Sequence, residues 1–117
     1  MQDVDINEKI QNRESFLLGN DGQYLGKLSL NRFDRESITN SYGLYGSKYS
    51  STSIWNKYST YGSKYSSLSP FNKYTSTPPR IYLHGVEFGY LTKNKYVGKN
   101  IDPEIILDWL VEKNLKY

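Results

Sequence analysis

Residues 37–52 read SITNSYGLYGSKYSST, residues 53–68 read SIWNKYSTYGSKYSSL, and residues 69–75 begin a third copy, SPFNKYT. The first two copies agree at 11 of 16 positions. Self-similarity at a fixed period is the signature of a repeat architecture, in which each copy forms the same local structure. The 16-residue repeat at residues 37–75 therefore defines the centre of the fold.

Each copy combines two turn-like units. Ser53 stands in an N-cap position before two bulky residues, which favours a single helical turn, and the Asn at its end tolerates the left-handed conformation. Gly62 can adopt positive φ and is followed by hydroxyl side chains that bond to the backbone locally. The principal tyrosines are separated by 7, 9, 7 and 9 residues, a spacing that neither a strand nor a long helix explains: Tyr42, Tyr49, Tyr58, Tyr65 and Tyr74.

Residues 34–79 are thus predicted to form an ordered but irregular wrap of compact turns that places these rings on a common side. Its expected inward anchors are Ile38, Ile54, Trp55 and Phe71. The competing interpretation is a low-complexity, disordered Ser/Tyr segment. Aromatic density and strict register favour order.

Two related hairpins flank the repeats. Residues 15–31 place turn residues between two apolar runs, and residues 80–92 do the same around Gly85. Residues 25–33 also align with residues 88–96, matching in Gly, Leu, Ser/Thr, Asn, Arg/Lys and Phe/Tyr. We therefore expect the hairpins to be related copies that pair into one antiparallel sheet of about four strands.

The two ends of the chain differ in their patterns. Residues 102–114 predict a helix, with Asp102 as N-cap and Pro103 at the first helical position. Its apolar stripe is expected to cover one side of the sheet and consists of Ile105, Ile106, Trp109 and Leu110. Residues 1–14 are either a short helix or a mobile segment. The 117 residues are expected to form a single small α+β domain.

The repeat frame S-I-x-N-x-Y-x-x-Y-G-S-K-Y-S, with its flanking Gly-x-Leu-Ser/Thr motifs, resembles a group of short bacterial proteins built from G-x-L-S-x-N-x-Y and Y-G-S-x-Y-S repeats. The similarity covers roughly residues 22–96. Residues 72–74 depart from it, because the group often has Asn-Pro-Tyr where this chain has Asn-Lys-Tyr. The resemblance implies a bacterial source and a repeat-built domain, and many of the similar proteins are exported. It implies no activity and no catalytic residue.

Charge is distributed unevenly along the chain. The net charge is +3, yet residues 37–86 contain five cations and no Asp or Glu, so the remainder carries −2. A local basic strip favours polyanions or is a solvated surface. There is no cysteine, so disulfides and Cys-based zinc sites are excluded. The polar N-terminal residues match neither a signal peptide nor a membrane anchor, so the location of the protein stays open.

Catalytic motifs are absent from the sequence. His84 is the only histidine and is expected to lie exposed at a hairpin turn. Neither G-x-x-x-x-G-K-[ST] nor G-x-G-x-x-G occurs, and no cluster of histidines or carboxylates has the spacing of a metal site. We expect a protein that is not an enzyme and that carries no cofactor.

The expected function is that of a structural or interaction module with an unidentified partner, either a glycan or another protein. In the binding alternative, exposed rings stack on a glycan or cell-wall polymer. The candidate ligand-binding residues are Trp55, Tyr58, Tyr61, Tyr65, Lys48, Lys57 and Lys64. Single-stranded nucleic acid, which uses ring stacking with basic side chains, is a weaker alternative. In the structural alternative, the same rings form the core, and solvent exposure distinguishes these interpretations.

Overall fold

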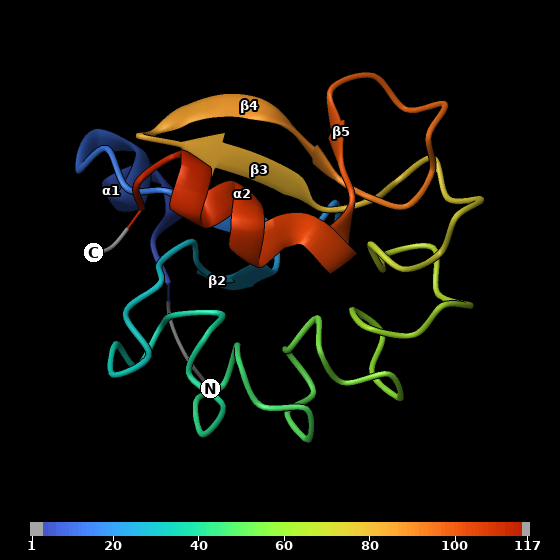
Figure 1. The fold of residues 1–117 in the computed structure, drawn as a ribbon, viewed down its shortest axis with the longest axis horizontal. Coiled ribbons are helices and arrows are strands. Elements are labelled where there is room, and N and C mark those ends of the chain that lie inside the picture. The colour runs from blue at the N-terminus through green and yellow to red at the C-terminus, as the bar shows by residue number, and fades with distance from the viewer. Residues whose placement is uncertain (1–3, 116–117) are drawn as a thin grey trace.

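A computed structural model describes residues 4–115 and shows a small α+β fold around a five-stranded mixed sheet of order β2-β1-β3-β4-β5 (Figure 1). In chain order the elements are α1 (Ile6–Gln11), β1 (Phe16–Leu18), β2 (Tyr24–Lys27), β3 (Arg80–Leu83), β4 (Val86–Leu91), β5 (Asn100–Ile101), a 3₁₀ helix (Pro103–Ile105) and α2 (Ile106–Glu112). The predicted α+β class is confirmed.

The two predicted hairpins, β1–β2 and β3–β4, join into one sheet through an antiparallel pairing of β1 with β3. The expectation of about four antiparallel strands is wrong at one edge. There β5 pairs with β4 in parallel. After β4 the chain turns back and returns to the same edge, where Asn100 pairs with Tyr90 across a loop that no turn motif predicts.

The two halves of the sheet repeat each other in detail. Both hairpins contain a bulge, and after each hairpin the chain returns parallel to the second strand. In the first half Ser37 bridges Lys27, whose N–H donates to the Glu36 carbonyl at 2.7 Å. In the second half the N–H of Tyr90 donates to the Lys99 carbonyl at 3.0 Å. The weak sequence duplication is therefore accompanied by a duplicated structure.

The sheet is covered on both faces. Against α2 lies the larger core, made of Leu17, Leu25, Leu28, Ile38, Ile54, Ile81, Leu91, Ile106, Trp109, Leu110 and Leu115. The second core, against which α1 packs, contains Phe16, Leu18, Tyr24 and Tyr45. Aromatic rings supply much of this second core, and Tyr24 meets Tyr45 edge-on at 5.0 Å between ring centroids. Tyr rings thus compensate for the shortage of aliphatic residues.

The C-terminal helix begins as predicted at Asp102, whose carboxylate accepts the N–H of Glu104 at 2.9 Å. Ile106, Trp109 and Leu110 are buried, but Ile105 is 51% exposed, so its assignment to the apolar stripe is wrong. The first turn is a 3₁₀ helix. Its tighter winding shifts the phase of the residues before α2 and turns Ile105 toward solvent.

Residues 6–11 form a helix, α1, which Asp5 caps by accepting the N–H of Glu8. Lys9 anchors this helix to the rest of the molecule through Glu14 at 3.2 Å and Glu36 at 2.8 Å. Burial disfavours the Lys9 ammonium, but the hydrogen bonds and charges of the two carboxylates outweigh it and raise the pKa of Lys9. Residues 1–3 lie outside the described part of the chain.

The wrap connects β2 to β3 as an arch of small loops along one side of the molecule (Figure 1). It is ordered, and it begins at Asn31, three residues earlier than predicted. Its backbone is a chain of turns in which the residue that ends one turn begins the next. The N–H of each such residue donates to the carbonyl of the preceding one, mostly three residues earlier. Four such three-residue steps and one four-residue step take the chain from Ser47 to Ser63, which is one period of the repeat. The 16-residue period is therefore the length of five consecutive turns.

The inner side of the wrap is built from one position of the repeat. Ile38, Ile54 and Pro70 occupy it and are fully buried, and each follows a buried serine. The predicted anchors Ile38 and Ile54 are confirmed. Trp55 and Phe71 are only half-buried, so their prediction as inward anchors holds only in part; both occupy the next position of the repeat, where the first copy has Thr39.

Candidate functional site

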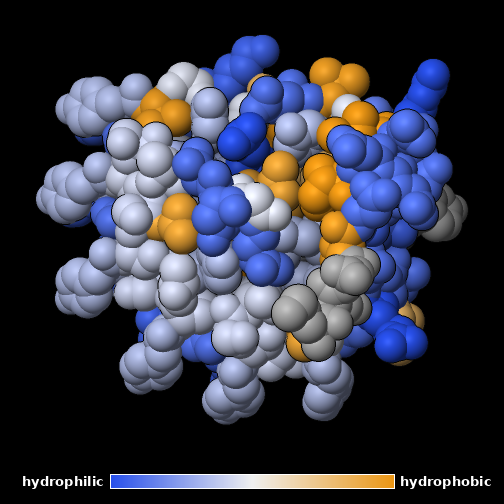
Figure 2. Space-filling model, turned by 180° about the vertical axis from the view of Figure 1, so that it is seen from behind, coloured by the Kyte–Doolittle hydropathy of each residue, from blue (hydrophilic) through white to orange (hydrophobic). Residues whose placement is uncertain are grey.

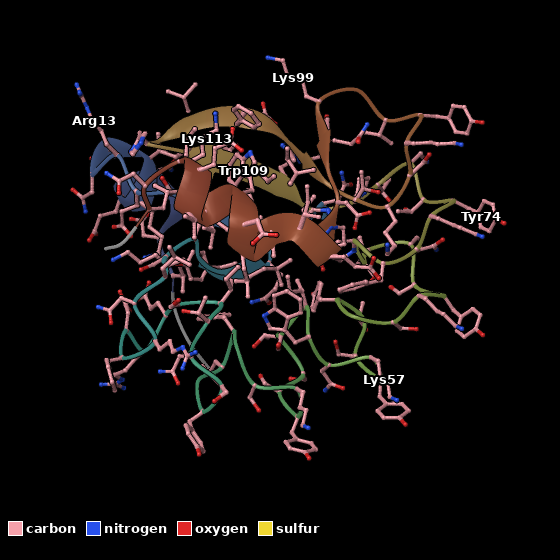
Figure 3. The ribbon with its side chains drawn as sticks, in the orientation of Figure 1. Arg13, Lys57, Tyr74, Lys99, Trp109 and Lys113 are labelled. Carbon is pink, nitrogen blue, oxygen red and sulfur yellow. The ribbon has the colours of Figure 1, made fainter. Side chains whose placement is uncertain are left out.

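Seven aromatic side chains stand on the outer edge of the wrap and its neighbouring loop, and each is between 81% and 97% exposed. This ring row consists of Phe33, Tyr42, Tyr49, Tyr58, Tyr65, Tyr74 and Tyr96. Figure 2 shows pale side chains projecting around this edge with gaps between them. In Figure 3, the labelled Lys57 and Tyr74 point away from the sheet. The repeat tyrosines of this row are thus not the core, and their interpretation as core is wrong, whereas Tyr45 of the first copy is buried in the second core.

Every ring of the row is held by the same local hydrogen bond. Its backbone N–H donates to a side-chain oxygen two residues earlier, at 3.0 to 3.2 Å. The accepting residues are Asn31, Asn40, Ser47, Asn56, Ser63, Asn72 and Asn94. Ser and Asn favour such turns because their short side chains reach the backbone nearby. The Ser/Asn-x-aromatic spacing therefore sets where each ring leaves the wrap.

The repeat asparagines make a second side-chain hydrogen bond, which the predicted left-handed backbone conformation did not anticipate. In each of the three copies, the Asn Nδ2 donates to the carbonyl six residues upstream, at 3.0 to 3.2 Å. Asn94 reaches the carbonyl of Thr75 in the same manner at 2.9 Å. None of these asparagines has positive φ, so that prediction is wrong. Their role is to tie successive turns together.

Gly46 and Gly62 also differ from the prediction, since neither has positive φ. They lie in the four-residue steps, where the chain passes close to the preceding asparagine. A Cβ on Gly46 would be 2.0 Å from the Asn40 carbonyl oxygen, and one on Gly62 would be 2.1 Å from that of Asn56. Glycine is required here by contact, not by backbone conformation.

A lysine precedes five of the seven rings and lies over the ring that follows it. The distances from Nζ to the ring centroid are 5.3 to 5.7 Å for Lys48, Lys57, Lys64, Lys73 and Lys95. Such cation–π contacts are worth about 0.5–1 kcal/mol at exposed sites. Within residues 4–115, none of these lysines takes part in an ion pair. The row therefore contains five sites at which a solvent-facing ring lies next to a lysine without an ion-pair partner among the described residues.

Most of the predicted site residues lie on this surface. Tyr58 and Tyr65 are exposed members of the row, and Lys48, Lys57 and Lys64 are exposed beside it. Trp55 lies beneath the row, half-buried, with its indole N–H donating to the Ile38 carbonyl at 2.8 Å. Tyr42, Tyr49, Tyr74 and Lys73 were not predicted as site residues, although the repeat register placed these tyrosines on the common side. Phe33, Tyr96 and Lys95 were not predicted either, and the aligned Asn-Arg-Phe and Asn-Lys-Tyr triplets were the signal that could have found them.

Tyr61 does not join the row. Its hydroxyl donates to the Asp21 carboxylate at 2.6 Å and so fastens the wrap to the first hairpin. Burial, together with the hydrogen bond and charge of Asp21, raises the pKa of Tyr61 to about 12. Tyr61 is therefore a structural contact.

His84 lies exposed at the turn between β3 and β4, with φ of 52°, as expected for a hairpin corner. Its backbone N–H donates to the Ser15 hydroxyl at 2.9 Å. Across residues 4–115, no three His, Asp or Glu side chains lie close enough together to hold a metal ion. No helix in the same part of the chain is long and apolar enough to cross a bilayer.

No protein-family model matches the chain, and comparisons with curated proteins and with solved structures likewise find no match. The resemblance to short bacterial repeat proteins therefore stays a prediction.

Proposed function

We propose that the protein is a non-enzymatic interaction module that binds an extended glycan through the ring row. The supporting observation is the exposure of seven rings on hydrogen-bonded turns. Exposed aromatic side chains gathered on one surface are typical of interaction sites. Because the turns already hold the backbone of each ring residue, less backbone entropy is lost when a ligand binds.

The separation of the rings favours a glycan over a nucleic acid. Five pairs of aromatic rings lie close together within residues 4–115, and none includes a member of the row. Each ring of the row is thus a separate platform with its own free face. A linear glycan with a regular helical repeat presents the same sugar face at regular intervals, so it suits separated platforms. Successive bases of a single strand are adjacent and suit continuous ones.

A bacterial source would make cell-wall and extracellular polysaccharides the first ligands to test. This expectation comes from the resemblance to exported repeat proteins. The hydroxyl of each Tyr and the ammonium of each Lys add polar contacts beside the sugar face. Ring stacking would supply the affinity, and the polar groups would orient the chain of sugars.

The test is affinity electrophoresis through gels containing neutral or acidic polysaccharides. Truncating two neighbouring rings, Tyr58→Ala with Tyr65→Ala, should weaken binding at least about tenfold, or about 1.4 kcal/mol, since aromatic anchors often contribute more than 1 kcal/mol each. Val111→Ala removes an exposed apolar side chain away from the row and should leave binding unchanged. Absence of binding to any polysaccharide would refute the proposal. So would retardation that the double variant leaves intact, or binding of an oligonucleotide alone.

A further inference from the structure

The ring row separates two different surfaces. Phe33 and Tyr42 line a groove on each of their sides. One groove also includes Leu107 of α2, and we call this side of the row the α2 flank. The other includes Glu8 and Lys9 of α1, and this side is the α1 flank. A polymer bound to the row has to follow one of them.

The two flanks have opposite charge. On the α2 flank, this groove and the next one, between Tyr58 and Tyr65, contain three cations and no carboxylate among their lining residues. The cations are Arg32, Lys57 and Lys64. The groove of the α1 flank contains four carboxylates, from Glu8, Glu14, Asp34 and Glu36, against three cations, from Lys9, Lys27 and Arg35. An anionic ligand is therefore attracted to the α2 flank and repelled from the α1 flank.

The α2 flank also has an aromatic floor. Trp55 lines both of its grooves, and the indole N–H bond to the Ile38 carbonyl fixes the ring in place. Phe71 lies 6.2 Å from Trp55 between centroids, at an interplanar angle of 58°. These two half-buried rings stand beside the exposed row, so a sugar chain on this flank meets rings below it as well as at its side.

We propose that the ligand is an acidic polysaccharide and that it lies along the α2 flank, over Trp55. Sugar faces stack on Trp55 and on the ring row, while the carboxylates of the polymer meet Arg32, Lys57 and Lys64. This inference rests on the proposed function and narrows it to one ligand class and one side of the row.

The two arginines Arg32 and Arg35 provide a matched test. They lie three residues apart, both are exposed, and they line grooves on opposite flanks. Wild type, Arg32→Gln and Arg35→Gln are titrated with polygalacturonate, with neutral hydroxyethyl cellulose and with oligothymidylate. We expect Arg32→Gln to weaken polygalacturonate binding two- to fivefold, as for a solvent-exposed ion pair, and Arg35→Gln to leave it unchanged. The triple variant with Lys57→Gln and Lys64→Gln should lose at least about tenfold and show a shallower salt dependence.

Quenching by acrylamide gives an independent readout, because Trp55 and Trp109 are the two tryptophans and Trp109 is 6% exposed. Polygalacturonate should protect the accessible Trp55 from the quencher. Equal effects of the two arginine variants, or no protection of Trp55, would overturn this inference. After either of these results the proposed function would still stand, provided that Tyr58→Ala with Tyr65→Ala abolished glycan binding. Binding of oligothymidylate alone would overturn both.

Discussion

Gly62→Ala tests whether the wrap is built from contiguous hydrogen-bonded turns. The new Cβ would lie 2.1 Å from the Asn56 carbonyl oxygen and 2.7 Å from that of Ile54. Both contacts are to backbone atoms, which cannot move aside as a flexible side chain can. To bring the nearest contact to 3.0 Å, the four-residue step has to open by about 1 Å. The turns on either side resist this movement because their N–H groups are already bonded.

Overpacking of this kind typically costs about 1–3 kcal/mol. We expect about 3 kcal/mol, at the upper end of that range, since the clash is with backbone. For a chain of this size the loss corresponds to a fall in Tm of about 10 °C. Thermal unfolding followed by circular dichroism, with urea unfolding to obtain the free energy, measures both quantities.

Gly98→Ala is the matched control, because its Cβ would meet nothing within 4 Å and its φ is not positive. Its stability should be unchanged or raised by about 0.4–1 kcal/mol through a less flexible unfolded chain. If Gly62→Ala melted within about 2 °C of the wild type while Gly98→Ala behaved as expected, the close approach at Gly62 would be wrong. The explanation of the 16-residue period would then fail with it.

Three further outcomes follow from single side chains. Asn56→Ala removes the bonds to the Tyr58 N–H and the Ser50 carbonyl, so it should cost about 2 kcal/mol in urea unfolding; a cost below about 0.5 kcal/mol would contradict the linking role of this asparagine. Tyr58→Ala should change the free energy of unfolding by no more than about 0.5 kcal/mol, because the ring is exposed, and a larger loss would mean that the row is structural. Tyr61→Phe should cost about 1 kcal/mol at pH 7, since it breaks a partly exposed bond to Asp21. Because the pKa of Tyr61 is raised in the folded state, its hydroxyl stabilises the fold fully below the unfolded-state pKa of 10.0, and this stabilisation is lost as the pH rises toward about 12. The difference in free energy of unfolding between wild type and Tyr61→Phe should therefore close over that range. A constant difference would contradict the assignment.

Local signals in the sequence were sufficient for the two hairpins and for the last helix. The turn residues around Gly22 and Gly85 predicted both hairpins, and Asp102 with Pro103 predicted the start of the last helix. These features depend on contacts between near neighbours in the chain, so the residues themselves specify them. The return of β5 to the sheet edge pairs Asn100 with Tyr90, a separation longer than a turn motif spans, and the sequence contained no local sign of it.

The candidate site was predicted only in part, because position in the repeat did not determine exposure. Tyr45 and Tyr61 occupy the same place in successive copies, yet Tyr45 is buried against Tyr24 and Tyr61 is half-buried beside Asp21. Their chemistry is identical, and they differ only in which part of the first hairpin lies opposite. Tyr42, three residues before Tyr45, is 97% exposed.

By itself, the sequence determined the turns, their 16-residue period and the intervals at which rings leave the wrap, because these follow from hydrogen bonds between residues only a few positions apart. Only the tertiary structure decided which rings reach solvent, which are covered, and that the two sides of the row carry opposite charge. Burial and local charge depend on the surfaces that α1, α2 and the sheet bring against the wrap, and those surfaces come from distant parts of the chain.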